Sequence, residues 1–266
     1  MTLTLLTDYG RDDDFVGVCH AVIAGIAPDT RVIDLTHGIA RHDVREGALT
    51  LRNTLPYLPI GVHVAIVDPQ VGTERRAVAL RTEDGRMFVG PDNGVLSLAW
   101  QQAGGVTDAV DVTRSPHRLE PVSATFHGRD VFCPVAAHLA KGAELADAGE
   151  PLDPDALETI ELPAPRSEGD TLVAHVLSID RFGNAALNVG HEDLAGTGIT
   201  LGSQVEVLSG TEHFHAAVAQ TFADVRPGDI LVYEDSYRAL SIAINRGDAA
   251  ATLQLAPDSE VRITPR

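Results

Sequence analysis

The fold of the first part of this chain follows from residues 2–36, which read TLTLLTDYGRDDDFVGVCHAVIAGIAPDTRVIDLT. Thr2–Thr7 is a short apolar and β-branched run that stops at a turn, which is typical of a buried strand. Across Phe15–Ile26 apolar residues recur at steps of three and four, which predicts an amphipathic helix. Arg31–Thr36 is a second strand-like run. Strand, helix and strand in succession predict a parallel α/β sheet.

The same alternation continues along the chain and indicates where a ligand binds. A helical stretch over 43–55 leads to an apolar strand at Val62–Val67, and further short runs follow at 77–81 and 86–89. Parallel α/β sheets bind ligands at the carboxyl ends of their strands. The residues that follow the apolar runs are therefore the first candidates, and they are Asp8, Asp34 to His37, and Asp68.

The composition and the apolar periodicity of the sequence change after residue 150. The segment 151–170 is rich in proline and acidic residues and has little apolar periodicity, so we interpret it as a linker. From residue 171 short β-like runs alternate with glycine, asparagine and aspartate, as in a small antiparallel barrel. The predicted fold class is α/β: a mostly parallel α/β domain at 1–150, a linker at 151–170, and a small antiparallel β-barrel domain at 171–266.

Composition excludes several classes of function. The 266 residues include 20 basic and 38 acidic side chains, for a formal net charge of −18, which argues against nucleic acid and anionic membranes as partners. No apolar run approaches the roughly 20 residues that a membrane span needs. The opening residues lack the features of a secretory signal. Cys19 and Cys133 lie far apart in sequence, which favours free thiols in a reducing, cytoplasmic compartment.

No familiar cofactor loop occurs in the sequence. The chain lacks the GxGxxG, GxxxxGK[ST], GxSxG, HExxH and CxxC patterns. Asp12 to Asp14 are interpreted as a turn and a helix N-cap. Asp8 stands at a strand end, where one carboxylate can accept hydrogen bonds from both hydroxyls of a ribose. Asp68 near Arg75 is consistent either with a structural ion pair or with a catalytic site. A single histidine such as His127 is not by itself evidence of catalysis.

Taken in order, six motifs resemble those of one family. They are TDYG at 7–10, VDPQVGTER at 67–75, PDNG at 91–94, TFHGRD at 125–130, DRFGNAALN at 180–188 and LSIAINRGDAA at 240–250. This combination resembles the S-adenosylmethionine hydroxide adenosyltransferases, the adenosine-forming S-adenosylmethionine hydrolases related to fluorinase and chlorinase. The resemblance runs from Leu3 to about Leu253. It implies an α/β domain followed by a β-barrel, and a homotrimer with active sites between subunits.

The resemblance also implies the reaction and the residues that carry it out. The catalytic roles fall on Asp68, Arg75 and His127, which handle the attacking water. The halogenating relatives have tyrosines in place of Asp68 and His127, so water or hydroxide is the expected nucleophile here. Displacement at C5′ of the ribose releases methionine as a neutral thioether, and only the nucleophile needs help. Whether His127 acts as a base or positions the water stays open, as does preference for the (R)-sulfonium epimer.

Substrate binding is implied for a further set of residues. Asp8 is expected to hold the ribose, Asn184 the adenine, and Asp180 and Ser236 the ammonium and carboxylate of the methionine. The full expected substrate-binding set is Asp8, Asp180, Phe182, Asn184, Phe222, Tyr233, Ser236, Tyr237, Asn245 and Arg246. The sequence departs from the halogenases at two points, because Ala186 replaces their tryptophan and Tyr237 replaces the arginine of fluorinase.

Two other classes of function stay open at this point. The segment TDYGRDDDF superficially resembles the calcium-binding opening of nucleoside N-ribohydrolases, with Asp8, Asp13 and Asp14 as hard oxygen ligands. That family has a carboxylate before the threonine, where this chain has Leu6. A non-catalytic adenosine or S-adenosylmethionine sensor would share the pocket without the need to handle water. The main hypothesis expects a small-molecule substrate, no cofactor and no metal.

Overall fold

The chain divides into two compact units. The computed structural model describes residues 1–266, with one unit at Met1–Ile160 and the other at Glu161–Arg266. The boundary falls inside the segment 151–170 that the sequence suggested as a linker. Part of that segment is nevertheless structured, since three residues at 150–152 pair with a strand of the first unit.

The first unit is built on a mixed sheet of seven strands in the order β2-β1-β3-β5-β4-β6-β7. Neighbouring strands among β2, β1, β3 and β5 are parallel, and the pairs on the β4, β6 and β7 side are antiparallel. The strands are β1 Thr2–Thr7, β2 Arg31–Thr36, β3 Gly61–Ile66, β4 Ala77–Thr82, β5 Met87–Pro91, β6 Val106–Asp111 and β7 Glu150–Leu152.

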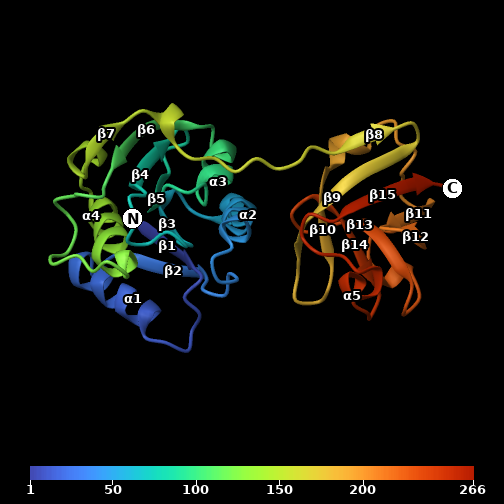
Figure 1. Ribbon diagram of the computed structural model, residues 1–266, viewed down its shortest axis with the longest axis horizontal. Coiled ribbons are helices and arrows are strands. Elements are labelled where there is room, and N and C mark those ends of the chain that lie inside the picture. The colour runs from blue at the N-terminus through green and yellow to red at the C-terminus, as the bar shows by residue number, and fades with distance from the viewer. The chain divides into compact units, whose positions relative to one another are not determined.

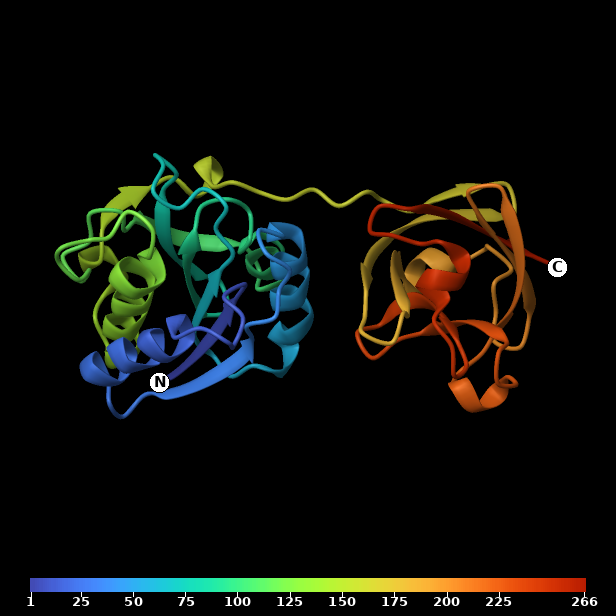
Figure 2. The same cartoon turned by 60° about the horizontal axis from the view of Figure 1, so that its bottom comes forward.

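Four helices cover the two faces of this sheet. Figures 1 and 2 show α1 and α4 on one face, with α2 and α3 on the other. Their bounds are α1 Phe15–Ile26, α2 Val44–Thr54, α3 Ser97–Gln102 and α4 Cys133–Lys141. Leu3 and Leu5 of β1 pack in the same core cluster as Cys19 of α1 and Val135 of α4, whereas Leu6 packs in the cluster of Leu51 from α2. Burial of these aliphatic side chains drives the layered arrangement.

One local expectation needs correction, and the prediction of two free thiols is confirmed. Asp14 occupies the N-cap position of α1, but its side chain makes no capping hydrogen bond. The two cysteines, distant in sequence, are neighbours in the core between α1 and α4. A hydrogen bond with Cys19, together with burial, raises the pKa of the Cys133 thiol well above its usual value, so the Cys133 thiol stays neutral in the core.

The second unit is a closed barrel. Its sheet runs β10-β14-β13-β12-β11-β15-β9-β8, and a further pairing between β10 and β9 closes it. All pairs are antiparallel except β12 with β13. The strands are β8 Arg166–Glu168, β9 Thr171–Ile179, β10 Ala185–Gly190, β11 Gln204–Ser209, β12 Glu212–Val218, β13 Ile230–Glu234, β14 Ala239–Ile244 and β15 Glu260–Pro265. One helix, α5 Ala249–Leu253, packs on this unit (Figure 2).

The barrel core follows from the period of two along its strands. In β11, Val205 and Val207 are fully buried, whereas Gln204 is exposed. The remaining turns are short 3-10 segments at Leu55–Tyr57, Leu145–Asp147, Pro154–Ala156, His191–Leu194 and Phe222–Asp224.

The predicted fold class, an α/β sheet domain followed by a small β-barrel, is confirmed. The sequence analysis did not anticipate β6 or α4, and it missed the short π-helical turn Gly128–Phe132 that leads into α4. Such turns are rare and have no pattern of their own in sequence. None of the helices is both long enough and apolar enough to cross a bilayer.

Candidate active site

A cavity of about 380 Å³ opens at the carboxyl edge of the first unit's sheet. Asp8 directly follows β1 and Asp68 follows β3, and because these strands are parallel neighbours their ends meet at one edge. The cavity is lined by Asp8, Tyr9, Asp13, Phe15, Arg41, His42, Ile66, Asp68, Val71, Thr125, Phe126, His127 and Gly128. The edge predicted from the strand pattern is therefore where the structure places these candidates.

Asp68, Arg75 and His127 form one connected chain of polar contacts. The Nε of Arg75 donates to both carboxylate oxygens of Asp68 at 3.0 Å, and Nη2 makes a further short contact with Oδ2. The same Nη2 lies 3.0 Å from Nδ1 of His127. The side chains of Arg75 and Asp68 are only 4% and 6% exposed, so this ion pair is shielded from water. The structure thus brings together all three residues assigned to catalysis.

The contact with Arg75 defines the protonation of His127. A guanidinium nitrogen only donates hydrogen bonds, so Nδ1 of His127 must accept and carries no proton. Burial and the positive charge of Arg75 lower the pKa of His127, which favours the neutral ring near neutral pH. The neutral ring therefore carries its proton on Nε2.

Two loops hold this group in place. Gly72 has φ +81°, and a Cβ on it would lie 2.4 Å from the carbonyl oxygen of Ala124, so the loop after β3 packs directly on the loop before His127. Asp130, which is buried, accepts hydrogen bonds from the backbone N–H of Ser123 at 2.8 Å and from Arg129. These bonds from Ser123 and Arg129 to Asp130 thus fix the loop that carries His127.

Aromatic side chains form one wall of the cavity. The rings of Tyr9, Phe15 and Phe126 contact one another, with centroids 5.0 to 5.8 Å apart. Burial, with nearby thiols and carboxylates, raises the pKa of Tyr9 well above its usual value, so its phenol stays neutral. A Cβ at Gly128 would lie 2.3 Å from Oη of Tyr9, which explains why glycine follows His127.

Asp8 lines the cavity, and its carboxylate does not cluster with those of Asp13 and Asp14. Asp8 lines the cavity and accepts a hydrogen bond through Oδ2 from the backbone N–H of His42 at 2.9 Å. Asp13 also lines the cavity, but Asp14 lies at the start of α1. The ligand atoms of these three acids do not gather within 4.8 Å of one another. The calcium-site alternative thus gains no support from the arrangement of Asp8, Asp13 and Asp14.

Asp180 and Asn184, the two candidates at the start of the barrel, belong to one turn between β9 and β10. Oδ1 of Asp180 accepts hydrogen bonds from the backbone N–H groups of Phe182 and Asn184, at 2.8 and 3.0 Å. The side-chain Nδ2 of Asn184 donates to Oδ2 of Asp180 at 2.8 Å. This pairing leaves Asn184 one amide hydrogen and its carbonyl oxygen for a ligand. The side chain of Phe182 is 68% exposed, so it is not part of the barrel core.

The other barrel candidates divide into aromatic and structural residues. Phe222 packs on Tyr233 with ring centroids 5.2 Å apart, and burial with the charges of Asp235 and Asp180 raises the pKa of Tyr233 to about 12. Tyr237, in the turn after β13, is 51% exposed. Asn245 donates its side-chain amide to the carbonyl of Val225 at 2.8 Å, so it has a structural function.

The last two candidates are turn residues. Arg246 adopts φ +59°, two positions after the end of β14. Ser236 lies in the same turn as Tyr237, between β13 and β14. Both residues are exposed and lie outside the barrel core.

Comparison with known proteins decides the family. Residues 3–149 match the SAM hydroxide adenosyltransferase N-terminal domain, and residues 174–262 match the SAM hydroxide adenosyltransferase C-terminal domain. The chain belongs to the SAM hydroxide adenosyltransferase family. The chain is 47% identical to an (R)-S-adenosyl-L-methionine hydrolase of Salinispora arenicola, over 98% of this chain and 97% of the relative.

More distant members of the SAM hydroxide adenosyltransferase family extend the comparison. A fluorinase of an Actinoplanes species is 28% identical over 98% of this chain and 97% of its own. The solved structure of an uncharacterized conserved protein from Thermotoga maritima matches with a TM-score of 0.92 and 36% identity, covering 99% of this chain and 100% of that one. The resemblance drawn from the six motifs is confirmed.

Several residues that line the cavity were not predicted from the sequence as site residues. Tyr9 and Phe126 lie inside the TDYG and TFHGRD motifs, so their position in those motifs was the available signal. Phe15 was interpreted only as part of the apolar face of α1, yet its ring is 40% exposed and contacts both. Arg41 and His42 come from the loop before α2, which carries no distinctive pattern.

Proposed function

We propose that this protein hydrolyses S-adenosyl-L-methionine to adenosine and L-methionine by attack of water or hydroxide at C5′ of the ribose, without a metal ion. The observation that carries the proposal is the contact chain from Asp68 through Arg75 to His127 on the wall of a cavity of about 380 Å³. Family membership and the 47% identical hydrolase support the same reaction. The (R)-sulfonium epimer, named for that relative, is the proposed substrate.

The chemistry needs little from the protein beyond placing the nucleophile. The new oxygen–C5′ bond forms as the C5′–sulfur bond breaks, and the bonding electron pair leaves with sulfur. Because the sulfonium becomes a neutral thioether, the leaving group needs no general acid. Hydroxide gives the 5′-hydroxyl directly, and attack by water releases one proton to solvent. The site therefore contributes mainly position and a shielded environment.

His127 acts in this proposal as a positioning donor and not as a general base. Its Nδ1 is occupied by Arg75, and the neutral ring carries a proton on Nε2, which can donate to the oxygen of the nucleophile. Asp68 in turn holds the guanidinium of Arg75 through both carboxylate oxygens. A base would require an unprotonated Nε2, which this hydrogen-bond pattern disfavours.

Substrate recognition is proposed for Asp8 and for the turn residues of the barrel. Asp8 would accept hydrogen bonds from the ribose hydroxyls. Asn184 keeps a carbonyl oxygen and one amide hydrogen, the pair of groups that an adenine edge requires. Asp180 would attract the methionine ammonium and Ser236 its carboxylate. Phe182, Phe222, Tyr233 and Tyr237 would supply ring surface, with the backbone at Asn245 and Arg246.

The proposed assembly is a homotrimer with active sites between subunits, working in the cytoplasm on a small molecule. The partly exposed aromatic rings of Phe182, Phe222 and Tyr237 support an assembly that covers them. The buried free thiols of Cys19 and Cys133 suit a reducing compartment. Light scattering on the purified protein tests the trimer, because a monomer mass would contradict it.

The reaction is tested by product analysis of the full-length protein with each S-adenosylmethionine epimer. We expect adenosine and methionine in equal amounts, unchanged by a chelator or by chloride. Asp68→Asn should reduce the rate, whereas Asp84→Asn, which removes an acid from another arginine pair, should not. Release of free adenine that a chelator abolishes would indicate an N-ribohydrolase. Binding by calorimetry without any product would indicate a sensor.

A further inference from the structure

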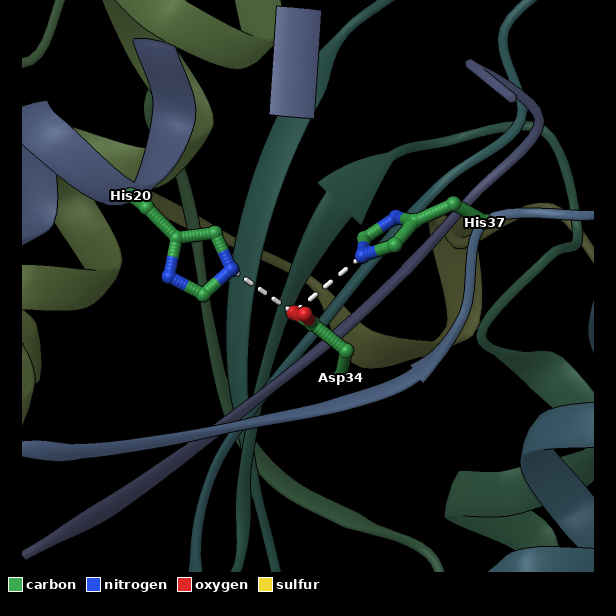
Figure 3. A group of neighbouring side chains, drawn as sticks. All are labelled: His20, Asp34 and His37. Carbon is green, nitrogen blue, oxygen red and sulfur yellow. Dashed lines mark hydrogen bonds and ion pairs between the residues drawn. The ribbon is translucent and has the colours of Figure 1, made fainter. Parts of the chain in front are cut away.

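Outside the cavity, three side chains converge on one point between α1 and β2. His20 comes from α1, Asp34 from β2, and His37 directly follows β2 (Figure 3). The Nε2 atoms of His20 and His37 lie 2.8 and 3.1 Å from the same oxygen, Oδ1 of Asp34. This is the one group of three or more His, Cys, Asp or Glu residues whose potential ligand atoms lie within 4.8 Å of one another.

His37 is held in the orientation that a metal ligand needs. Its side chain is 1% exposed, and its Nδ1 lies 2.9 Å from Oγ1 of Thr7, which leaves Nε2 facing Asp34. Ligand histidines commonly hold their second nitrogen on a neighbouring polar group in this way. Although Nε2 is close to the carboxylate, it makes no well-directed hydrogen bond. A buried nitrogen in that state costs about 1–3 kcal/mol, which a bound cation would offset.

The spacing of the ligand atoms is close to that of a zinc site. Bonds of about 2.0–2.2 Å to imidazole nitrogen and carboxylate oxygen place tetrahedral neighbours roughly 3.3 Å apart. The observed 2.8 and 3.1 Å would need to open by only a few tenths of an ångström. His20 and Asp34 are 37% and 34% exposed, so an ion and a completing water can reach the site from solvent.

We propose that His20, Asp34 and His37 bind one divalent transition-metal ion of the class that prefers imidazole and carboxylate ligands, with Zn²⁺ as its type. None of the three lines the cavity, so the ion takes no part in the proposed hydrolysis. It would join α1 to the edge strand β2. The carbonyl of His37 also accepts the backbone N–H of Gly10, in the loop that carries Asp8 and Tyr9. The expected role is therefore to stabilise that loop and helix.

The test is titration of the chelator-treated full chain with Zn²⁺, followed by calorimetry and thermal unfolding. We expect one ion per chain and a higher melting temperature when it is bound. His20→Ala and Asp34→Asn should weaken binding by about 100-fold or more and abolish the shift. His213→Ala is the matched control, because it removes a histidine from a carboxylate pair with no second imidazole. It should bind Zn²⁺ like the original chain.

A second readout separates this site from the cavity. Co²⁺ in place of Zn²⁺ should give visible absorption bands of a nitrogen- and oxygen-ligated ion, retained in His127→Ala and lost in His20→Ala. Absence of one-to-one binding, or binding that survives His20→Ala, would overturn the proposal. Adenosine formation by the metal-free protein is measured separately, so failure of the metal site and failure of the proposed hydrolysis are distinguishable.

Discussion

Nη2 of Arg75 donates a hydrogen bond to Nδ1 of His127 at 3.0 Å, while Nε of the same guanidinium is bonded to Asp68. One arginine therefore sets both the position and the tautomer of the histidine. The ammonium group of a lysine could not replace it, because it lacks the planar guanidinium that bonds to two partners at once. In the proposed catalytic group, Arg75 is thus the residue that contacts both of the others.

Replacement of Arg75 by lysine tests this dependence. We expect Arg75→Lys to lower kcat for adenosine formation by about 100-fold, because His127 loses its fixed tautomer and Asp68 its bidentate partner. KM should change little if Arg75 does not touch the substrate. Arg86→Lys, in an ion pair with Asp84 away from the cavity, is the control. An unchanged kcat in Arg75→Lys would contradict the assigned role.

The pH profile of the reaction tests the state of His127. Burial and the charge of Arg75 lower its pKa below the ordinary 6.5. The neutral ring is required, so kcat should stay level above about pH 6.5 and fall only as pH drops through the lower pKa. Protonation of Nδ1 would place two donors against each other and break the contact with Arg75. Steady-state rates across this range measure the midpoint, and a midpoint above 6.5 would contradict the prediction.

Asp8 is tested through the substrate's ribose. Asp8→Asn keeps the shape of the side chain but replaces one acceptor oxygen with a donor, so one ribose hydroxyl loses its partner. We expect KM for S-adenosylmethionine to rise by about 10-fold, with a smaller effect on kcat. Asp12→Asn, at an exposed acid of the same loop, is the control. Equal KM values for the two variants would remove Asp8 from the ribose site.

We expect His63, in the middle of β3, to make the free energy of unfolding depend on pH. Burial and the nearby charge of Arg86 lower the pKa of His63 to about 4, and its Nδ1 lies 2.9 Å from Oγ1 of Thr4. The unfolded chain, with a histidine pKa near 6.5, takes up the proton first. Stability should therefore be lost as pH falls from about 6.5 towards 4, by at most roughly 3 kcal/mol from this group.

Urea unfolding of His63→Gln measures that contribution. The glutamine can keep a hydrogen bond to Thr4 but does not titrate. The difference in unfolding free energy between the two proteins should therefore shrink at acid pH. A difference that stays constant between about pH 7 and about pH 5 would show that His63 is not responsible.

Gly128 tests the close approach of Tyr9. A Cβ at this position would lie 2.3 Å from Oη of Tyr9, whose ring is packed against Phe15 and Phe126. We expect Gly128→Ala to lower the free energy of unfolding by about 1–3 kcal/mol and to reduce kcat, because the wall of the cavity must shift. Gly25→Ala, in α1 with open space around it, should be neutral or stabilising. Thermal unfolding and steady-state rates of both variants measure these effects on stability and kcat.

The sequence predicted elements well where packing has a simple period. Thr2–Thr7, Phe15–Ile26 and Arg31–Thr36 are found with the bounds that their patterns suggested. The two strands are short apolar or β-branched runs, and the helix repeats its apolar residues at steps of three and four. The turn Gly128–Phe132 and helix α4 were missed, since α4 is buried almost all round and shows no alternation with polar residues. Asp14 shows the reverse error, in which a capping residue type stands at the N-cap position without making the bond.

Sequence alone determined the two-part fold class, the family, and the edge of the sheet where Asp8 and Asp68 meet. These follow from short-range periodicity, and from motifs whose order along the chain is itself specific. Tertiary structure decided what the side chains do to one another. Arg75 and His127 are 52 positions apart, and His20 and Asp34 are 14 apart. Only the packing of loops and helices on the sheet brings such groups within hydrogen-bond distance, where tautomer, pKa and metal affinity are set.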